Sequence, residues 1–338
     1  MKNLFDYASK ELSQDAFLRW LFENHDCENE SVRNAFWRLF NNFTDDKLKG
    51  KHITDLVTVA QWKGIDVSIW FKVDGVEHLI VIEDKTDSNM HSNQLARYTE
   101  QIAQHNSCWK EHWNPQNHKL IRYVEKDENI FKVFYKTNIV DSWEKEIVEK
   151  SGWKLYDIYL ICELFADVRS SNEILDCYIE HIKKIHSDAK REKKPSEWNL
   201  VSWHSFFNDY QSYDCISKEK DIGCYKNEYY YIKFLVEGHR GDMPCLEVRS
   251  RDFKKDKDSG KWSIIVRAVL YNLSHPANIE DIKLWQTSLE KNGFCPNYRK
   301  DPSRHKQIGT ICIDDMEDTE QALLKGFDRI SNLMLTLF

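Results

Sequence analysis

The sequence predicts an α/β fold in two domains, a first domain of helices and strands and a smaller second domain of the α+β class. The chain of 338 residues is longer than one compact domain of typical size. Its 41% of hydrophobic residues, with only 11 Gly and 6 Pro, is the composition of a chain that folds. Apolar residues recur first at helical spacing and then in strand-like runs, which indicates both element types in the first domain.

Two amphipathic helices open the first domain, at residues 11–22 and 31–43. β-rich runs follow at 65–71 and 78–82. Asp74-Gly75 lies between them, and Asp-Gly between two such runs favours a tight antiparallel hairpin. The remaining elements expected in this domain are a helix over 89–107, strands over 119–124 and 131–135, and helices at about 141–150 and 155–186.

A basic segment at 183–195 loses the apolar face of the preceding helix and is the best candidate for a domain boundary. A solvated helix end or a linker is one interpretation, and an arm that contacts phosphates is another. We therefore expect domains at 1–190 and 196–338. The second domain should contain strands at 229–236, 245–249, 262–269 and 308–313, with helices at 278–291 and 317–335.

Composition limits the function classes. No run approaches the roughly 20 apolar residues that span a bilayer, and charges interrupt the N-terminal segment, so we expect no membrane association and a cytoplasmic protein. The nine Cys are scattered, which favours buried free thiols over a zinc or iron–sulfur site. A net charge of −7 argues against a protein that coats nucleic acid, although a local basic face remains open.

The hairpin places acidic residues opposite each other. A two-residue turn at Asp74-Gly75 pairs residues whose numbers sum to 149, and this register sets Asp66 opposite Glu83. Like charges at directly opposed positions are destabilising, and a divalent cation such as Mg²⁺ would compensate for their repulsion. Lys85 lies two residues after Glu83 and therefore on the same face.

A purely structural interpretation of Glu83 and Lys85 is a salt bridge at a strand end, because Glu-x-Lys is common by chance. Against it stands the apolar run at 79–82, which is typical of a strand buried on both faces. Such a strand that ends in Glu-Asp-Lys-Thr-Asp is expected to deliver its charged end to a cleft.

Ile65-Asp66 followed by Ile82-Glu83-Asp84-Lys85 resembles the PD-(D/E)XK nuclease superfamily of restriction-like and repair endonucleases. The resemblance covers roughly residues 1–165, and the segment 11–18 with Glu-Asp-Lys-Thr and Gln94 is similar to uncharacterised bacterial members. It implies a restriction-endonuclease-like αβββαβ core, in which a mixed central sheet is flanked by helices. Ile65 stands where the first motif has Pro, a position that the mechanism does not use.

The resemblance also implies roles for single residues. Asp66, Glu83 and the backbone carbonyl of Asp84 would bind Mg²⁺, for which Mn²⁺ should substitute. Lys85 would orient the attacking water and stabilise the charge that develops on the phosphate. The implied reaction is hydrolysis of phosphodiester bonds by a metal-activated water, in an endo- or exodeoxyribonuclease manner, and DNA is the expected partner.

Three further residues have assignments with open alternatives. Glu11 matches an acidic residue on the first helix of many members, with Asp15 one turn later as the rival, but an acid at a helix start also stabilises the helix dipole. Gln94 matches a helix Gln of repair-type members, whereas the alternative is an exposed polar residue. Asp87 is a weaker candidate for a second metal.

Two competing hypotheses come from other classes. One is a catalytically silent module that binds nucleic acid or protein on the same fold. The other assigns the work to the second domain, as an adaptor whose Tyr229, Tyr230 and Tyr231 contact a protein partner, although alternating Tyr on a strand is more often core plus exposed face. A homodimer through this domain is left open. The stretch 249–257 mixes basic and acidic residues and favours a solvated loop over a phosphate-binding patch.

Overall fold

The computed structural model of the chain describes residues 3, 5, 10–86, 88–91, 93–111, 122–212, 219–225, 228–235, 243–270, 279–296 and 306–337. The chain divides into two compact units, Met1–Ser187 and Asp188–Phe338, which we call unit 1 and unit 2. The division falls inside the basic segment 183–195, near the end of helix α6 (Glu173–Ala189). The basic segment is therefore partly a helix end.

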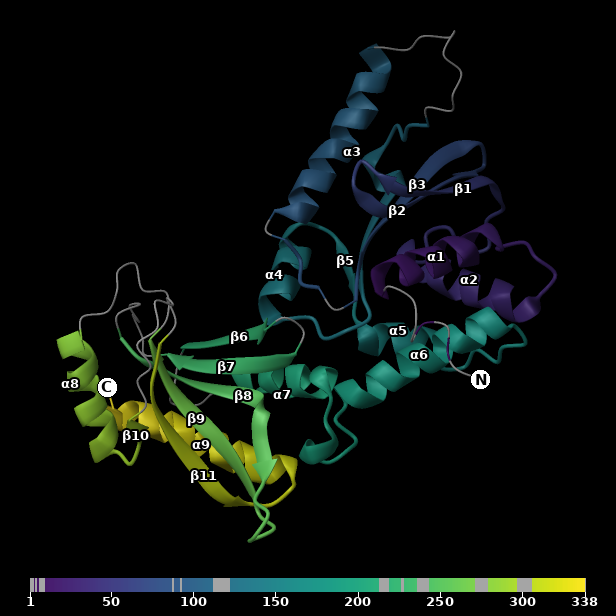
Figure 1. Cartoon of the computed structure of the whole chain (residues 1–338). Coiled ribbons are helices and arrows are strands. Elements are labelled where there is room, and N and C mark those ends of the chain that lie inside the picture. The colour runs from purple at the N-terminus through teal and green to yellow at the C-terminus, as the bar shows by residue number, and fades with distance from the viewer. Residues whose placement is uncertain are drawn as a thin grey trace. The chain divides into compact units, whose positions relative to one another are not determined.

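Unit 1 is built on a mixed five-stranded sheet in the order β1-β2-β3-β4-β5 (Figure 1). β2 pairs antiparallel with β1 and with β3, whereas β4 pairs in parallel with β3 and with β5. The strands are β1 (Ile53–Trp62), β2 (Ile65–Val73), β3 (Val76–Lys85), β4 (Ile130–Lys136) and β5 (Lys154–Tyr156). The predicted mixed sheet flanked by helices is confirmed.

Helices cover both faces of this sheet (Figure 1). On one face, Phe40 of α2 (Glu30–Phe43) packs against Phe71 of β2 with ring centroids 5.3 Å apart, and α1 (Lys10–Glu23) contacts β1, β2 and β3. On the other face, α3 (Gln94–Glu111) packs on β2 and β3. Side chains along a strand alternate between the two faces of the sheet, so the same strands contribute to both layers. The core between α3 and the sheet includes Trp70, Leu79, Val81, Leu95, Tyr98 and Ile102.

The hairpin has the predicted register. Val73 pairs with Val76 and the pairing continues with a constant sum to Val67 and Ile82. Both turn residues, Asp74 and Gly75, have positive φ (51° and 79°), as a type I′ turn requires. The turn thus sets the pairing on which the position of Asp66 opposite Glu83 depends.

Two strand assignments near this hairpin need correction. β1 was not predicted; it is an edge strand in which half of the residues are exposed, and it carries a bulge between Thr54 and Val57. A strand was also predicted over 119–124. Residues 122–124 form none, and the rest of that segment lies outside the described residues. Half-exposed edge strands lack the continuous apolar run that marks a buried strand, which is why β1 gave little signal.

The expected helical stretch at 155–186 is divided by caps. After β5, Asp157 caps α5 (Ile158–Phe165) by accepting a hydrogen bond from the Leu160 backbone N–H at 3.0 Å. Asn172 then caps α6, because its Oδ1 accepts from the backbone N–H groups of Ile174 and Leu175. The preceding helix, α4 (Ser142–Lys150), lies where it was predicted.

Unit 2 contains a six-stranded antiparallel sheet in the order β10-β11-β9-β8-β7-β6. The strands are β6 (Glu219–Tyr225), β7 (Tyr229–Leu235), β8 (Cys245–Lys255), β9 (Trp262–Leu270), β10 (Cys295–Pro296) and β11 (Lys306–Met316). Three helices supply side chains to one core with this sheet: α7 (Leu200–Ser212), α8 (Ile279–Lys291) and α9 (Glu320–Leu337). The α+β class is as predicted, and α7, β6 and β10 are additions. β8 continues to Lys255, so most of the stretch 249–257, where a solvated loop was favoured, belongs to a strand.

The basic segment between the units does not extend as a free arm at Arg191. Its guanidinium pairs with Asp209 at 2.7 Å and with Glu320 at 3.1 Å, and it donates to the Ser205 hydroxyl at 2.5 Å. These partners belong to unit 2, so this residue is part of the packing of unit 2.

Among the described residues, no helix is both long and apolar enough to cross a membrane. The described cysteines are free thiols, as expected, but Cys224, Cys295 and Cys312 are exposed, so the expectation of burial holds only for some of them.

Candidate active site at the end of strand β3

The end of β3 places three ionisable side chains in the interior of unit 1. Glu83 and Asp84 are fully buried, and Lys85 is 6% exposed. β3 is central, with β2 on one side and β4 on the other, so both edges of its backbone are occupied. The charged residues therefore continue a strand whose preceding residues, 79–82, are all buried. Burial of such groups is costly unless each one is paired.

The Lys85 ammonium lies where three oxygens converge. Its Nζ is 2.5 Å from Glu83 Oε1, 3.0 Å from the Asp84 carbonyl oxygen and 3.8 Å from Asp66 Oδ2. These are the three groups that the sequence analysis assigned as metal ligands. A positive charge at their meeting point offsets the repulsion between the two carboxylates.

Asp66 is anchored at the start of β2. Its Oδ2 accepts a hydrogen bond from the Asp84 backbone N–H at 2.9 Å, and its Oδ1 accepts from Gln61 Nε2 at 3.0 Å. The side chain is 17% exposed, so it forms the more open side of the cluster. This contact agrees with the position that the register predicts for Asp66, one step beyond the pair Val67 and Ile82.

Gln94 reaches the cluster from the first turn of α3. Its Nε2 donates to Glu83 Oε1 at 2.6 Å, and the same nitrogen lies 2.9 Å from the Tyr98 hydroxyl, which donates to the Gly64 carbonyl at 2.7 Å. The alternative of an exposed polar residue is wrong, because Gln94 is buried. Tyr98 was not among the predicted site residues. Its place four residues after Gln94, on the same helix face, was the available signal.

Asp84 points to the opposite face of the sheet, toward α1. Its Oδ1 accepts from Gln14 Nε2, and Gln14 Oε1 accepts from the Thr137 hydroxyl at 2.8 Å. Asp15 is also buried and its charge acts on Asp84. Gln14 and Thr137 were not among the predicted site residues, because no local pattern connects α1 or the end of β4 with this strand.

Burial dominates the protonation of both carboxyls. Desolvation and, after it, the negative charge of Asp66 raise the pKa of Glu83 to about 8 against the opposing effect of Lys85. Desolvation also raises the pKa of Asp84 well above its ordinary value, with Asp15 as the next cause. Glu83 is therefore largely protonated at neutral pH unless another cation favours its charged form.

We expect Gln14→Leu to lower the free energy of unfolding by about 1–3 kcal/mol, because it leaves two buried partners, Asp84 and Thr137, without their hydrogen bonds. Urea denaturation of the two forms measures this difference. Gln104→Leu, at an exposed site on α3, is the matched control and should change stability by less than about 0.5 kcal/mol. Equal losses of unfolding free energy in the two variants would show that the hydrogen bonds of Gln14 do not stabilise the fold.

The other predicted site residues are placed only in part. Glu11 lies in α1, but its side chain is outside the described residues, as is Asp87. Asp15 lies beside Asp84 and on the face opposite to Glu83. Of the two acidic residues considered on the first helix, Asp15 lies near the site. The role of Glu11 stays a prediction.

A second buried ion pair holds the segment between β3 and α3. Lys136, the parallel partner of Lys85 in β4, donates to Glu144 Oε2 at 2.6 Å, and both side chains are almost completely buried. Glu144 Oε1 accepts from the Met90 backbone N–H at 2.9 Å, and Lys136 also donates to Asn89 Oδ1 at 3.2 Å. This pair thereby anchors Asn89 and Met90, which lie just before α3, the helix that carries Gln94.

The donor set suits Mg²⁺ better than a metal that needs a complete protein cage. Within the described residues, no group of three or more His, Cys, Asp or Glu side chains is placed to hold a metal ion. Asp66 and Glu83 nevertheless supply two carboxylates beside the Asp84 carbonyl, and no protein donor in this part of the structure reaches the buried Glu83 Oε2. Mg²⁺ commonly takes one or two carboxylates and completes its shell with water and phosphate.

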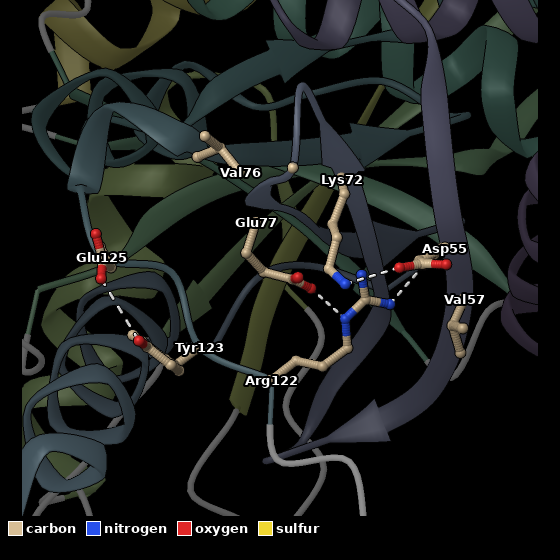
Figure 2. A pocket seen from close by; sticks show the side chains of 9 residues that line it. Asp55, Val57, Lys72, Val76, Glu77, Arg122, Tyr123 and Glu125 are labelled. Carbon is tan, nitrogen blue, oxygen red and sulfur yellow. Dashed lines mark hydrogen bonds and ion pairs between the residues drawn. The ribbon is translucent and has the colours of Figure 1, made fainter.

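A hollow of about 670 Å³ on the outer part of the same sheet lies apart from these residues (Figure 2). Its charges are paired internally. Lys72 bonds Asp55 Oδ2 at 2.7 Å, and Arg122 bonds Glu77 and, at 2.7 Å, the Asp55 carbonyl. Both cations of the hollow are thus paired with acids, so the hollow offers no concentrated positive charge for a ligand, although Arg122 Nη2 has no hydrogen-bond partner within the described residues.

Comparisons of the chain with protein-family models, with curated proteins and with solved structures find no match in any of the three.

Proposed function

We propose that unit 1 is a metal-dependent nuclease that hydrolyses phosphodiester bonds, with DNA as its expected substrate. The observation that carries the proposal is the convergence of Asp66, Glu83 and the Asp84 carbonyl on one buried ammonium, Lys85. A structural salt bridge needs one carboxylate for each ammonium. Two carboxylates and a carbonyl around one cation form an oxygen-rich centre that also suits a hard metal ion.

The order of elements supports the same proposal. α1, β1, β2, β3, α3 and β4 follow one another in the αβββαβ sequence of a restriction-endonuclease-like core, with α2 inserted after α1. Glu83, Asp84 and Lys85 lie at the end of the central strand β3, and Gln94 lies at the start of the helix that follows. These are the positions that the sequence resemblance implies.

Each residue has a distinct task in the proposed reaction. Asp66, Glu83 and the Asp84 carbonyl would hold Mg²⁺, which supplies a more acidic water and neutralises charge on the phosphate. Lys85 would turn its ammonium from Glu83 toward the phosphate and stabilise the charge that develops there. Gln94 keeps the Glu83 carboxylate oriented through its 2.6 Å hydrogen bond.

Cleavage of labelled single-stranded and duplex DNA and RNA with Mg²⁺ or Mn²⁺ tests the proposal. We expect wild type to cut, and Asp66→Ala and Lys85→Ala each to lose at least about a hundredfold in rate, because each removes a group that stabilises the transition state. Lys72→Ala, on the same sheet but in the separate hollow, is the matched control and should keep full activity.

Cutting that survives in both site variants would remove this cluster from the mechanism. If no form cuts and calorimetry detects no metal binding, the proposal fails and the silent binding module on the same fold takes its place.

A further inference from the structure

Unit 1 has another hollow, of about 610 Å³, between α2 and the loop that joins α5 to α6. The buried face of α2, with Phe36 and Phe40, packs into the core, and the hollow lies on the other face. The residues that α2 contributes to the lining are Glu30, Ser31, Asn34, Trp37, Arg38 and Asn41. None of them belongs to the cluster at the end of β3, so the hollow is a separate place on the same unit.

The loop is fastened to α2 at both ends of the hollow. Near α5, Arg38 Nη1 donates to the Leu164 carbonyl at 3.4 Å. Near α6, the Ser171 backbone N–H donates to the Ser31 hydroxyl at 3.2 Å, and the Ser171 hydroxyl accepts from Asn29 Nδ2 at 3.2 Å. The walls are thus held by the fold itself, as is usual for small-ligand sites.

The hollow has donor groups that are not used by the protein. Arg169 is exposed, and within the described residues its guanidinium forms no hydrogen bond and no ion pair. Arg38 uses only the bond to Leu164 and keeps its other N–H donors. The side-chain oxygen of Asn41 is buried, so the amide nitrogen is its accessible end. Two guanidinium groups and an amide are therefore available to an acceptor-rich ligand.

The hollow also contains two acids, Glu30 and Asp167, and both are exposed. In the part of the chain that the structure describes, neither of them forms an ion pair with Arg38 or Arg169. Glu30 precedes Arg38 by eight positions on α2, which is about 12 Å along the helix axis. A ligand that complements this lining has an anionic group for the arginines and hydroxyl groups that donate to the acids.

The remaining lining decides the kind of ligand. Eight of the ten lining residues are polar or charged, and the two apolar ones are Trp37 and Val168. An apolar ligand would leave these polar groups without partners, which is costly. A hydroxyl-rich ligand satisfies them, and a volume of about 610 Å³ lies within the usual range of small-ligand sites.

We propose that this hollow binds a small phosphate monoester on a hydroxyl-rich body, which is the chemistry of sugar phosphates and nucleoside monophosphates. Arg38 and Arg169 hold the phosphate, because the paired donors of a guanidinium match its oxygens. A phosphate monoester carries about two negative charges near neutral pH and so suits two arginines better than a carboxylate does. The inference goes beyond the proposed function, because it requires neither a metal nor cleavage.

Isothermal titration calorimetry of the full chain in EDTA at low salt tests the inference, with ribose 5-phosphate, AMP, ribose and adenosine as probes. We expect both phosphorylated probes to bind at least about tenfold more tightly than their unphosphorylated counterparts, because only they make charge-assisted hydrogen bonds to the arginines. Equal Kd values for ribose 5-phosphate and AMP would identify the sugar phosphate as the recognised unit. Tighter binding of AMP would identify a nucleotide, and both results support the inference.

Arg38→Gln and Arg169→Gln should each raise the Kd of ribose 5-phosphate about tenfold, because each removes one charged partner of the phosphate. Arg33→Gln is the matched control, since Arg33 lies on α2 outside the lining and donates to the Cys27 carbonyl, and its Kd should equal that of wild type. Arg169 contacts none of the described residues through a hydrogen bond or an ion pair, so its variant should fold even if Arg38→Gln does not.

Unchanged Kd in both Arg38→Gln and Arg169→Gln would place the phosphate elsewhere and overturn the inference. Ribose binding as tightly as ribose 5-phosphate would overturn it as well. Competition by sulfate at the same concentration as ribose 5-phosphate would reduce the hollow to a simple anion site, with the same consequence. Because the assay contains no metal and no nucleic acid, its failure leaves the cleavage experiment unaffected.

Discussion

Glu83→Gln is expected to abolish cleavage and to stabilise the metal-free protein above neutral pH. The carboxyl of Glu83 is fully buried, and its pKa is raised to about 8 from its ordinary value of 4.5. The folded state therefore keeps a proton that the unfolded state loses, and stability falls as pH rises from about 4.5 to about 8. An amide carries no such cost, so at pH 8–9 the variant should gain roughly 1–3 kcal/mol.

The measurement is urea denaturation in EDTA at pH 5 and pH 8.5, where the gain should appear only at the higher pH. Glu144→Gln is the matched control, because Glu144 is equally buried but pairs with Lys136 at 2.6 Å. Loss of that charge leaves a buried ammonium unpaired and should destabilise. A Glu83→Gln variant that is less stable than wild type at pH 8.5 would show that Glu83 serves the fold rather than a cation.

Mg²⁺ binding is expected to strengthen with pH, by roughly tenfold per unit between about pH 6 and pH 8. Glu83 must lose its proton to act as a ligand, and below its pKa of about 8 each binding event releases that proton. Above this pH the affinity should level off. The sign follows from the raised pKa, because the protonated form dominates in the folded protein at neutral pH.

Calorimetric titration with Mg²⁺ in two buffers of different ionisation enthalpy measures both the affinity and the proton release. About one proton should leave at pH 6.5 and almost none at pH 9. An affinity that is flat from pH 6 to pH 8 would exclude Glu83 as a ligand. Asp66→Asn should lose binding at every pH and so separates loss of a ligand from the proton effect.

The hairpin was the part of the site that the sequence could predict in detail. Asp74-Gly75 specifies a two-residue turn, and the strand period then carries the register to Asp66, Glu83 and Lys85 without further information. The place of Gln94 near the site was expected from a resemblance and not from spacing, and its contact with Glu83 was not predicted. Local chemistry was sufficient wherever a single turn connected the residues concerned.

Contacts between distant segments were beyond such reasoning. Gln14 meets Asp84 across 70 positions of sequence, and Thr137 meets Gln14 across 123. Neither pair has a periodic or motif signal, because the packing of α1 on the sheet decides them. The edge strand β1 was not predicted for a related reason, since a strand with only two buried residues has little apolar pattern.

The backbone of Glu83 and Asp84 is expected to be among the most rigid parts of unit 1. These adjacent residues bond to helices on opposite faces of the sheet, Glu83 to Gln94 and Asp84 to Gln14. Their backbone also lies in the central strand, so exposure of it to solvent requires the sheet and both helical layers to separate. Their amide protons should thus exchange with deuterium only through unfolding of most of unit 1, among the slowest in the chain. Any adaptation to substrate must then come from side chains such as Lys85, because the backbone beneath them is among the last parts of the unit to open.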